Sequence, residues 1–195
     1  MEGETNIFPK ADAEVVSEPC ASCGVKCCNR FAVPITGFDL IRLIEKTGLE
    51  IDKFCRLADS KYIESAPHSL VFIFNKGELE ERLLTLIRKK NEYCVFSKHS
   101  KGCGVWGSHP MVCRAYPFTV DEKGNIQSVK NFVCPRKWEK NEYAERAVKA
   151  VVAKQNLEIE AYNKIVRKWN ADHSKEKGEK EFFEYLIKES RARSR

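Results

Sequence analysis

The cysteine-rich stretch CASCGVKCC, at residues 20–28, governs how the rest of the sequence is interpreted. It holds Cys20, Cys23, Cys27 and Cys28 of the chain's nine cysteines. Two residues between the first pair let the backbone loop around a metal. The adjacent side chains of Cys27 and Cys28 diverge in most backbone conformations. We therefore expect a polynuclear cluster or two separate metals to accommodate them more easily than a single ion.

Four further cysteines are spread over a longer segment; they are Cys94, Cys103, Cys113 and Cys134. Thiolates are soft donors, and zinc and iron–sulfur clusters both commonly take four of them, so either set, or a mixture, could supply one site. The second set has no further CxxC spacing, which argues against a zinc ribbon built from two knuckles. Cys134 precedes a proline, as in ferredoxin motifs, but the regular CxxCxxCxxxCP run is absent.

The length of the chain and its first residues indicate the redox compartment. At 195 residues the chain can bury a hydrophobic core without disulfides. Residues 1–19 have neither the basic n-region nor the apolar h-region of a secretory signal, and no apolar run approaches the ~20 residues of a membrane span. We therefore expect a cytoplasmic protein without membrane contact, in which reduced thiols bind metal. A disulfide scaffold is the competing interpretation, and the odd number of cysteines argues against it.

The net charge of +6 makes nucleic acid a partner to consider. The excess is small and is spread evenly between residues 1–138 and 139–195, although the final ESRARSR is locally basic. Such an excess is more typical of a solvated surface than of an electrostatic footprint. Binding of nucleic acid is therefore the least favoured hypothesis.

The chain divides into three parts by its apolar pattern. Residues 1–19 predict a flexible leader, and residues 20–138 a cysteine-cluster metal-binding domain. Residues 139–195 predict a C-terminal helical extension, because apolar residues recur at helical spacing for about thirty residues and then again beyond a polar link. Four apolar side chains share one side of the second, shorter helix: Phe182, Phe183, Leu186 and Ile187. We expect these helices to be where a protein partner could bind.

Short helices are expected within the cysteine region. The segment ITGFDLIRLIEKTG predicts a helix in which Thr36 and Asp39 cap the N-terminus and Gly48 ends the last turn. A second short helix is expected over residues 51–58. On it, Cys55 lies beside apolar neighbours and is interpreted as a buried small hydrophobe rather than a ligand.

Strand-like segments complete the expected fold. Residues 70–74 predict a strand, residues 83–88 and 93–96 a hairpin around the turn KKNE, and residues 118–133 a second hairpin around DEKGN. The fold class is therefore α+β, with small antiparallel hairpins and short helices around a cysteine cluster, a long C-terminal helix and a second shorter helix.

Taken in order, these motifs resemble the YkgJ-type cysteine-cluster family, whose CxxCxxCC-type domain is described as chelating zinc or iron. The matching elements are CASCGVKCC, CVF at 94–96, CGVW at 103–106, HPMVCRAYPF at 109–118 and CP at 134–135. The chain departs from the family's pattern in the three residues before the Cys27–Cys28 pair and in His109, where the family usually has arginine. The flagellin lysine methylases carry a similar cluster, and the resemblance thus leaves an enzymatic role open.

Other side chains near the cysteines are weaker candidates. His109 lies four residues before Cys113, but eight cysteines already saturate two sites, and a nucleophilic Cys113–His109 pair would need an orienting third group. His99 is interpreted as a solvated loop residue. Arg114 and Tyr116 could donate hydrogen bonds to cluster sulfurs and tune metal affinity, or could simply pack and pair with neighbours.

Three functional hypotheses follow. The vicinal cysteines favour an iron–sulfur protein, with a cluster of the [4Fe–4S] kind, that transfers electrons or supports an enzymatic step. The alternative is a zinc-stabilised interaction or scaffold module, in which the metal supplies folding energy and the C-terminal helices bind a partner. A nucleic-acid binder is the third.

Overall fold

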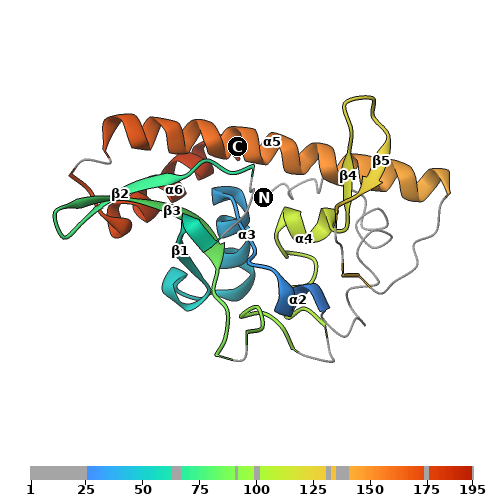
Figure 1. The fold of residues 1–195 in the computed structure, drawn as a ribbon, viewed down its shortest axis with the longest axis horizontal. Helices are drawn as coiled ribbons and strands as arrows, with labels where there is room; N and C mark the ends of the chain where they lie inside the picture. The colour runs from blue at the N-terminus through green and yellow to red at the C-terminus, as the bar shows by residue number, and fades with distance from the viewer. Residues whose placement is uncertain are drawn as a thin grey trace, which may run out of the picture.

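The structure of the protein is a computed structural model that describes residues 26–62, 67–90, 92–98, 102–130, 133–134, 141–173 and 176–194. The regular elements of these residues are, in chain order, α2 (Lys26–Arg30), α3 (Gly37–Thr47), the 3₁₀ turn η1 (Ile51–Lys53), β1 (Cys55–Asp59), the 3₁₀ turn η2 (Ser60–Tyr62), β2 (Val71–Asn75), β3 (Glu78–Leu86), α4 (Met111–Ala115), β4 (Phe118–Val120), β5 (Ile126–Ser128), α5 (Glu142–Asp172) and α6 (Glu179–Arg193) (Figure 1). The expected α+β class, with one long and one shorter C-terminal helix, is confirmed. The predicted leader at residues 1–19 lies outside the described residues.

The larger sheet is built around β3. It has the strand order β1-β3-β2, and both pairings are antiparallel. Beyond the first residue of β2, the chain before α3 continues the pairing: Leu86 N–H donates to Val33 C=O at 2.9 Å, and Ile35 N–H donates to Leu84 C=O at 3.1 Å. The second half of β3 is therefore paired on both sides, and α3 starts directly from the sheet.

Helix α3 forms as its sequence predicts. Thr36 and Asp39 make a reciprocal capping box, and Gly48 takes the left-handed conformation (φ 65°) at the C-cap. Leu40, with no exposed surface, lies on the face that packs into the core. The helix begins and ends where local chemistry satisfies its free backbone groups.

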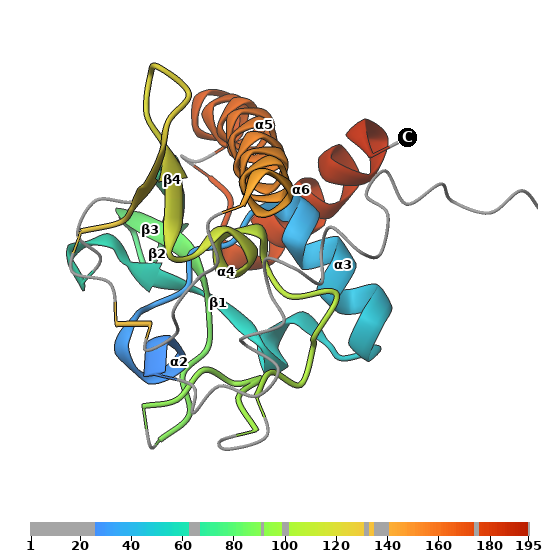
Figure 2. The same ribbon diagram turned by 90° about the vertical axis from the view of Figure 1, so that its right-hand side faces the viewer.

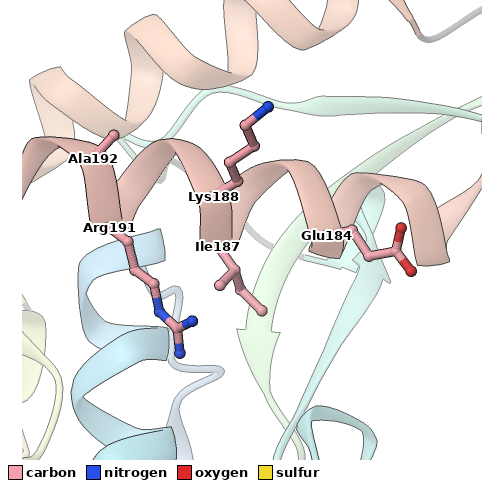
Figure 3. A pocket seen from close by; sticks show the side chains of 5 residues that line it. All are labelled: Glu184, Ile187, Lys188, Arg191 and Ala192. Atoms are coloured by element: carbon pink, nitrogen blue, oxygen red, sulfur yellow. The ribbon is translucent and has the colours of Figure 1, made fainter.

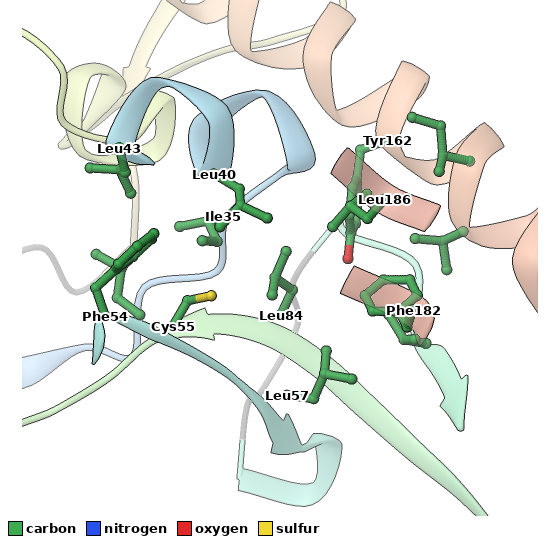
Figure 4. Packing of buried hydrophobic residues seen from close by; sticks show 14 of the residues in the cluster. Ile35, Leu40, Leu43, Phe54, Cys55, Leu57, Leu84, Tyr162, Phe182 and Leu186 are labelled. Atoms are coloured by element: carbon green, nitrogen blue, oxygen red, sulfur yellow. The ribbon is translucent and has the colours of Figure 1, made fainter. Parts of the chain in front are cut away.

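The C-terminal helices share one hydrophobic core with the sheet and α3 (Figure 4). The long helix α5 runs alongside β2, and α6 folds back beneath it (Figures 1 and 2). Trp169 and Tyr162 of α5 and Phe182 of α6 are at most 1% exposed, in the same cluster as residues of α3 and the sheet. Residues beyond 139 thus supply much of the core that the first part of the chain needs.

Two asparagines of α5 fix the register of the segment before and within β2. The side-chain amide of Asn163 accepts from Ser69 N–H at 2.6 Å and donates to Pro67 C=O at 2.9 Å. Asn170 likewise accepts from Phe72 N–H and donates to Leu70 C=O. Each amide replaces a neighbouring strand, because it satisfies both a donor and an acceptor of an otherwise unpaired edge.

One expectation about local structure is wrong, and another is met only in part. Residues 51–58 do not form one helix: a single 3₁₀ turn is followed by β1, because Cys55 and Leu57 alternate inward and pair with β3. The hairpin expected between residues 83–88 and 93–96 forms only where residues 87–89 meet 93–95: Arg88 and Cys94 make an antiparallel bridge, and Val95 N–H donates to Ile87 C=O. Most of β3 pairs with β1 and β2 instead.

The other strand predictions are confirmed within narrower bounds. The strand expected at residues 70–74 is β2. The hairpin expected over residues 118–133 is β4 paired with β5, which ends at Ser128.

The contact between α3 and α6 predicts a severe effect of a single added methyl group. A Cβ at Gly37 would lie 2.1 Å from Ser190 Oγ and 2.8 Å from Leu186 Cδ1, and both neighbours are fully buried. Gly37→Ala should therefore lower the free energy of unfolding by about 1–3 kcal/mol, as overpacked cores do, in urea titrations followed by circular dichroism.

A second substitution tests the cause of that loss. Ser190 Oγ has no hydrogen-bond partner among the described residues, so Ser190→Ala alone should change stability little. In the Ser190→Ala background, Gly37→Ala should cost clearly less than in the parent. Equal costs in both backgrounds would show that the helices do not approach as closely as described.

Candidate metal centre

The two sets of cysteines meet through the backbone of α2. Cys94 N–H donates to Cys28 C=O at 2.7 Å, although 66 residues separate them in sequence. Arg88 strengthens this junction, because its Nη2 donates to Asn29 C=O at 2.6 Å while its backbone bridges Cys94. Figures 1 and 2 both show α2 beside the loop that follows β3.

The loop from Cys94 to Cys103 doubles back on itself. Ser97 and Cys103 form an isolated antiparallel bridge, Lys98 N–H donates to Gly102 C=O, and Gly104 N–H donates to Phe96 C=O. The chain around one cysteine is thus held against the chain around the other. The backbone, rather than a metal, already brings these two segments together.

Cys113 is carried by α4, and Asp39 of α3 fixes the start of that short helix. Asp39 Oδ1 accepts from Met111 N–H at 2.9 Å in a buried position. Met111 and Ala115 also pack on the first half of α5. In both ribbon views α4 lies between α5 and α2.

Tyr116 links α2 to the segment that carries Cys134. Its ring packs against Phe31, with centroids 5.8 Å apart, and its hydroxyl accepts from Val133 N–H at 2.6 Å. Arg114 donates from Nε to His109 C=O at 2.9 Å and from Nη2 to Gly107 C=O. The hydrogen bonds that the structure describes for these two side chains all involve backbone groups of the loops around the cysteines.

Five thiols from both sets share one electrostatic environment. The pKa of Cys27 is lowered to about 7, chiefly because Cys28 hydrogen-bonds to its sulfur, and the same bond raises the pKa of Cys28. Burial raises the pKa of the thiols of Cys94 (to about 11), Cys103 and Cys113. Charge on Cys27 raises the pKa of each of the other four as well. Thiolates that repel one another in this way are stabilised by a cation.

Cys55 belongs to a different environment. It is 2% exposed and lies among apolar side chains of the main core (Figure 4). Burial raises the pKa of its thiol, and the charges that add to this come from Glu179 and Asp52 rather than from another cysteine. It is a buried small hydrophobe, as expected, although it lies on a strand rather than a helix.

His109 is buried beside the same region. It is 4% exposed, stacks on Trp106 with centroids 4.9 Å apart and planes at 11°, and neither ring nitrogen has a hydrogen-bond partner among the described residues. Burial, with a contribution from Arg114, lowers the pKa of His109 to about 3. The imidazole is therefore neutral at physiological pH. His99 lies outside the described residues.

The donor set fits a soft metal in its chemistry. The seven described cysteines are free thiols; they are Cys27, Cys28, Cys55, Cys94, Cys103, Cys113 and Cys134. Reduced thiols that gather at the edge of an apolar core are the ligands that zinc and iron–sulfur clusters take. In the part of the chain that the structure describes, no three Cys, His, Asp or Glu residues are arranged to hold one ion, and Cys20 and Cys23 lie outside that part.

One further feature of the described residues lies away from the thiols. An open hollow of about 570 Å³ lies along α6 and is lined by Glu184, Ile187, Lys188, Arg191 and Ala192 (Figure 3). None of the lining residues can supply a thiolate.

The helices in the described ranges are too short or too polar to cross a membrane.

The fold and the gathered thiols define a small α+β protein of the metal-chelating cysteine-cluster class. Over residues 19–145 the sequence matches the CxxCxxCC family, described as "Putative zinc- or iron-chelating domain". The match covers well over half of the chain, which therefore belongs to this family. The resemblance seen in the motifs is confirmed. No curated protein and no solved structure matches the chain.

Two parts of the site were not visible in the sequence. Asp39 was interpreted only as a helix cap, and its bond to Met111 joins segments 72 residues apart. The bond between Tyr116 and Val133 N–H likewise depends on how the loops fold. A residue pattern carries no signal for such contacts, because they arise from tertiary packing.

The unequal thiols predict an order of chemical labelling in the reduced, metal-free protein. Iodoacetamide reacts with thiolates, so Cys27 should be labelled ahead of Cys94, Cys103 and Cys113, with a half-maximal rate at about pH 7. The measurement is mass-spectrometric mapping of each cysteine between about pH 5.5 and 9.5.

Removing the hydrogen bond between the paired thiols gives the control. In Cys28→Ala the midpoint for Cys27 should rise toward the ordinary thiol value of about 8.5, because the lost bond favoured the thiolate. Cys28→Ser keeps a hydroxyl donor and should shift the midpoint less. An unchanged midpoint in Cys28→Ala would contradict the described pairing.

Proposed function

We propose that this protein binds an iron–sulfur cluster through cysteine thiolates and serves a redox or enzymatic-support role in the cytoplasm. The observation that carries the proposal is that charge on Cys27 raises the pKa of Cys28, Cys94, Cys103 and Cys113. Such coupling is expected where ligands of one metal centre gather before the metal is bound. The family's description as zinc- or iron-chelating supports metal binding itself.

The number of thiols favours a polynuclear centre. A structural zinc ion takes four ligands, whereas five described thiols already share one environment before Cys20, Cys23 and Cys134 are added. The vicinal pair Cys27–Cys28 adds to this argument, since two adjacent side chains reach one ion only with strain. A cluster of the [4Fe–4S] kind uses four of the eight candidates, and a second metal could take the others.

The protonation states of the thiols predict how metal uptake depends on pH. Raised pKa values keep Cys94 and Cys113 protonated at neutral pH in the metal-free protein, and a metal must displace those protons. Affinity should therefore increase as pH rises through the neutral range. Cys27, with its lowered pKa, is the thiolate that is ready to make the first bond.

Arg114 and Tyr116 are proposed to act on the centre through the loops. Arg114 holds the carbonyl groups of Gly107 and His109 before α4, and Tyr116 holds Val133 beside Cys134. Both side chains would fix the approach of a ligand-bearing segment rather than touch the metal. Supporting groups of this kind commonly change metal affinity by about 10- to 100-fold when removed.

Metal analysis of anaerobically purified, untagged protein tests the proposal. We expect iron and acid-labile sulfide in comparable amounts, and broad absorption near 400 nm, as iron–sulfur proteins generally show, that dithionite bleaches. A colourless protein with stoichiometric zinc would instead support the zinc-stabilised scaffold. A protein that takes up neither would overturn metal binding.

Matched cysteine variants localise the centre. Cys94→Ser should lower the iron content by half or more, because it removes a thiol from the coupled group. Cys55→Ala should keep the full content, because its thiol lies in the apolar core apart from that group. Equal losses in the two variants would point to general misfolding instead of a local centre.

Removal of the metal should not unfold the core. The main core consists mostly of apolar residues of α3, the sheet, α5 and α6, to which the cysteine loops add Cys94, Phe96 and Val105. A chelator should thus remove the metal while far-UV circular dichroism still shows one cooperative thermal transition. Chelator-induced loss of that transition would favour the zinc scaffold, in which the metal supplies the folding energy.

A further inference from the structure

A chain of buried ionic contacts joins α5 to the helix that carries Cys113. Arg42 of α3 donates from Nη1 and Nη2 to the two carboxylate oxygens of Glu158 on α5, both at 2.7 Å. The same Nη2 donates to Asp39 Oδ1 at 2.5 Å. That oxygen also accepts from Met111 N–H, the first residue of α4. Three helices are therefore joined through one guanidinium group.

The contacts between these groups hold the helices in place because the two carboxylates are largely shielded from solvent. The side chain of Asp39 is 2% exposed and that of Glu158 is 11% exposed. Burial acts to lower the pKa of Arg42, but Glu158 and Asp39 outweigh it and raise the pKa. Thr36 donates to Oδ2 of Asp39, and Arg42 donates to Oδ1 and balances the charge of this buried carboxylate, which would be destabilised without its cation. A bidentate arginine–carboxylate pair has a fixed geometry, and Glu158 therefore sets the plane of the guanidinium.

Cys113 lies two residues after Met111 on the helix that Asp39 contacts. Asp39 is among the charges that raise the pKa of Cys113, and the charges of Asp39, Glu158 and Cys113 all act on Arg114. Apolar contacts hold α4, including the Met111 side chain, against the first half of α5. The carboxylate of Asp39 adds a directional contact to the start of α4, because it accepts from the Met111 amide.

We propose that Glu158 is a positioning residue for the metal centre, acting through Arg42 and Asp39 on the ligand-bearing helix α4. This inference rests on the proposed metal binding. Glu158 lies beyond residues 19–145, where the chain matches its family, so the C-terminal helix takes part in organising the site.

The test compares two measurements in the full-length protein carrying Glu158→Gln. The first is hydrogen exchange of residues 109–116 in the reduced, metal-free state, which should become about tenfold faster while residues 92–98 stay unchanged. The second is zinc affinity, measured anaerobically by competition with a chromophoric chelator. It should fall about tenfold, as expected when a group that supports a ligand is lost.

Two control variants on the same helix separate positioning from stability. Glu160 lies two residues after Glu158 and makes an exposed ion pair with Lys164. Glu160→Gln removes this pair and should leave both measurements unchanged. Asn170→Ala removes the clamp on β2 and should lower the thermal midpoint without changing exchange at residues 109–116 or zinc affinity. Its stability loss shows what a purely structural defect in α5 does.

Each outcome decides between the inference and the function on which it rests. Unchanged exchange of residues 109–116 in Glu158→Gln overturns the positioning role, and so does faster exchange with unchanged zinc affinity. If Asn170→Ala lowers zinc affinity as much as Glu158→Gln, the effect is general destabilisation and the role is again rejected. If the wild-type protein takes up neither zinc nor reconstituted iron and sulfide, the proposed function itself fails, whatever the exchange shows.

Discussion

The constraint on which the rest of this structure depends is that cysteine-bearing segments from distant parts of the chain approach one another at the edge of an apolar core. Charge on Cys27 raises the pKa of four thiols that come from a short helix, a doubled-back loop and α4. Such a group is costly unless protons or a cation occupy it. The rest of the fold must hold these segments together against that cost, and it does so with backbone and carboxylate contacts rather than with the sulfurs themselves.

Because of this constraint, different segments of the chain supply most of the core and most of the cysteines. The sheet, α3, α5 and α6 bury their apolar faces in one cluster, and the cysteine-bearing segments contribute Cys94, Phe96 and Val105 to it. Cys94 attaches through the carbonyl of Cys28, and α4 through Asp39. The C-terminal helices are therefore both part of the core and part of the support for the site, although the family match ends at residue 145.

The elements predicted best from the sequence are those whose ends or apolar face are specified by their own residues. The capping box of Thr36 and Asp39, the stop at Gly48 and the long apolar periodicity of α5 each specify an element without outside help. The segment around Cys55 predicts a helix because its few apolar residues fit the period of a helix as well as that of a strand. Only its pairing with β3 shows that it is a strand. The hairpin after residue 86 is shorter than expected for a related reason: strand pairing is set by tertiary packing, and most of β3 pairs with β1 and β2, which precede it in the chain.

The candidate ligands could be read from the sequence, because cysteines in a reduced chain have few other uses. Their supports could not, since the bonds from Asp39 to Met111 and from Tyr116 to Val133 exist only after folding. Native mass spectrometry of the intact chain, prepared without oxygen, tests most directly whether the thiols hold a metal. The thiolate interpretation predicts a folded ion whose added mass equals iron plus inorganic sulfide, less the displaced protons. A folded ion at the bare thiol mass after reconstitution with iron, sulfide or zinc would contradict it.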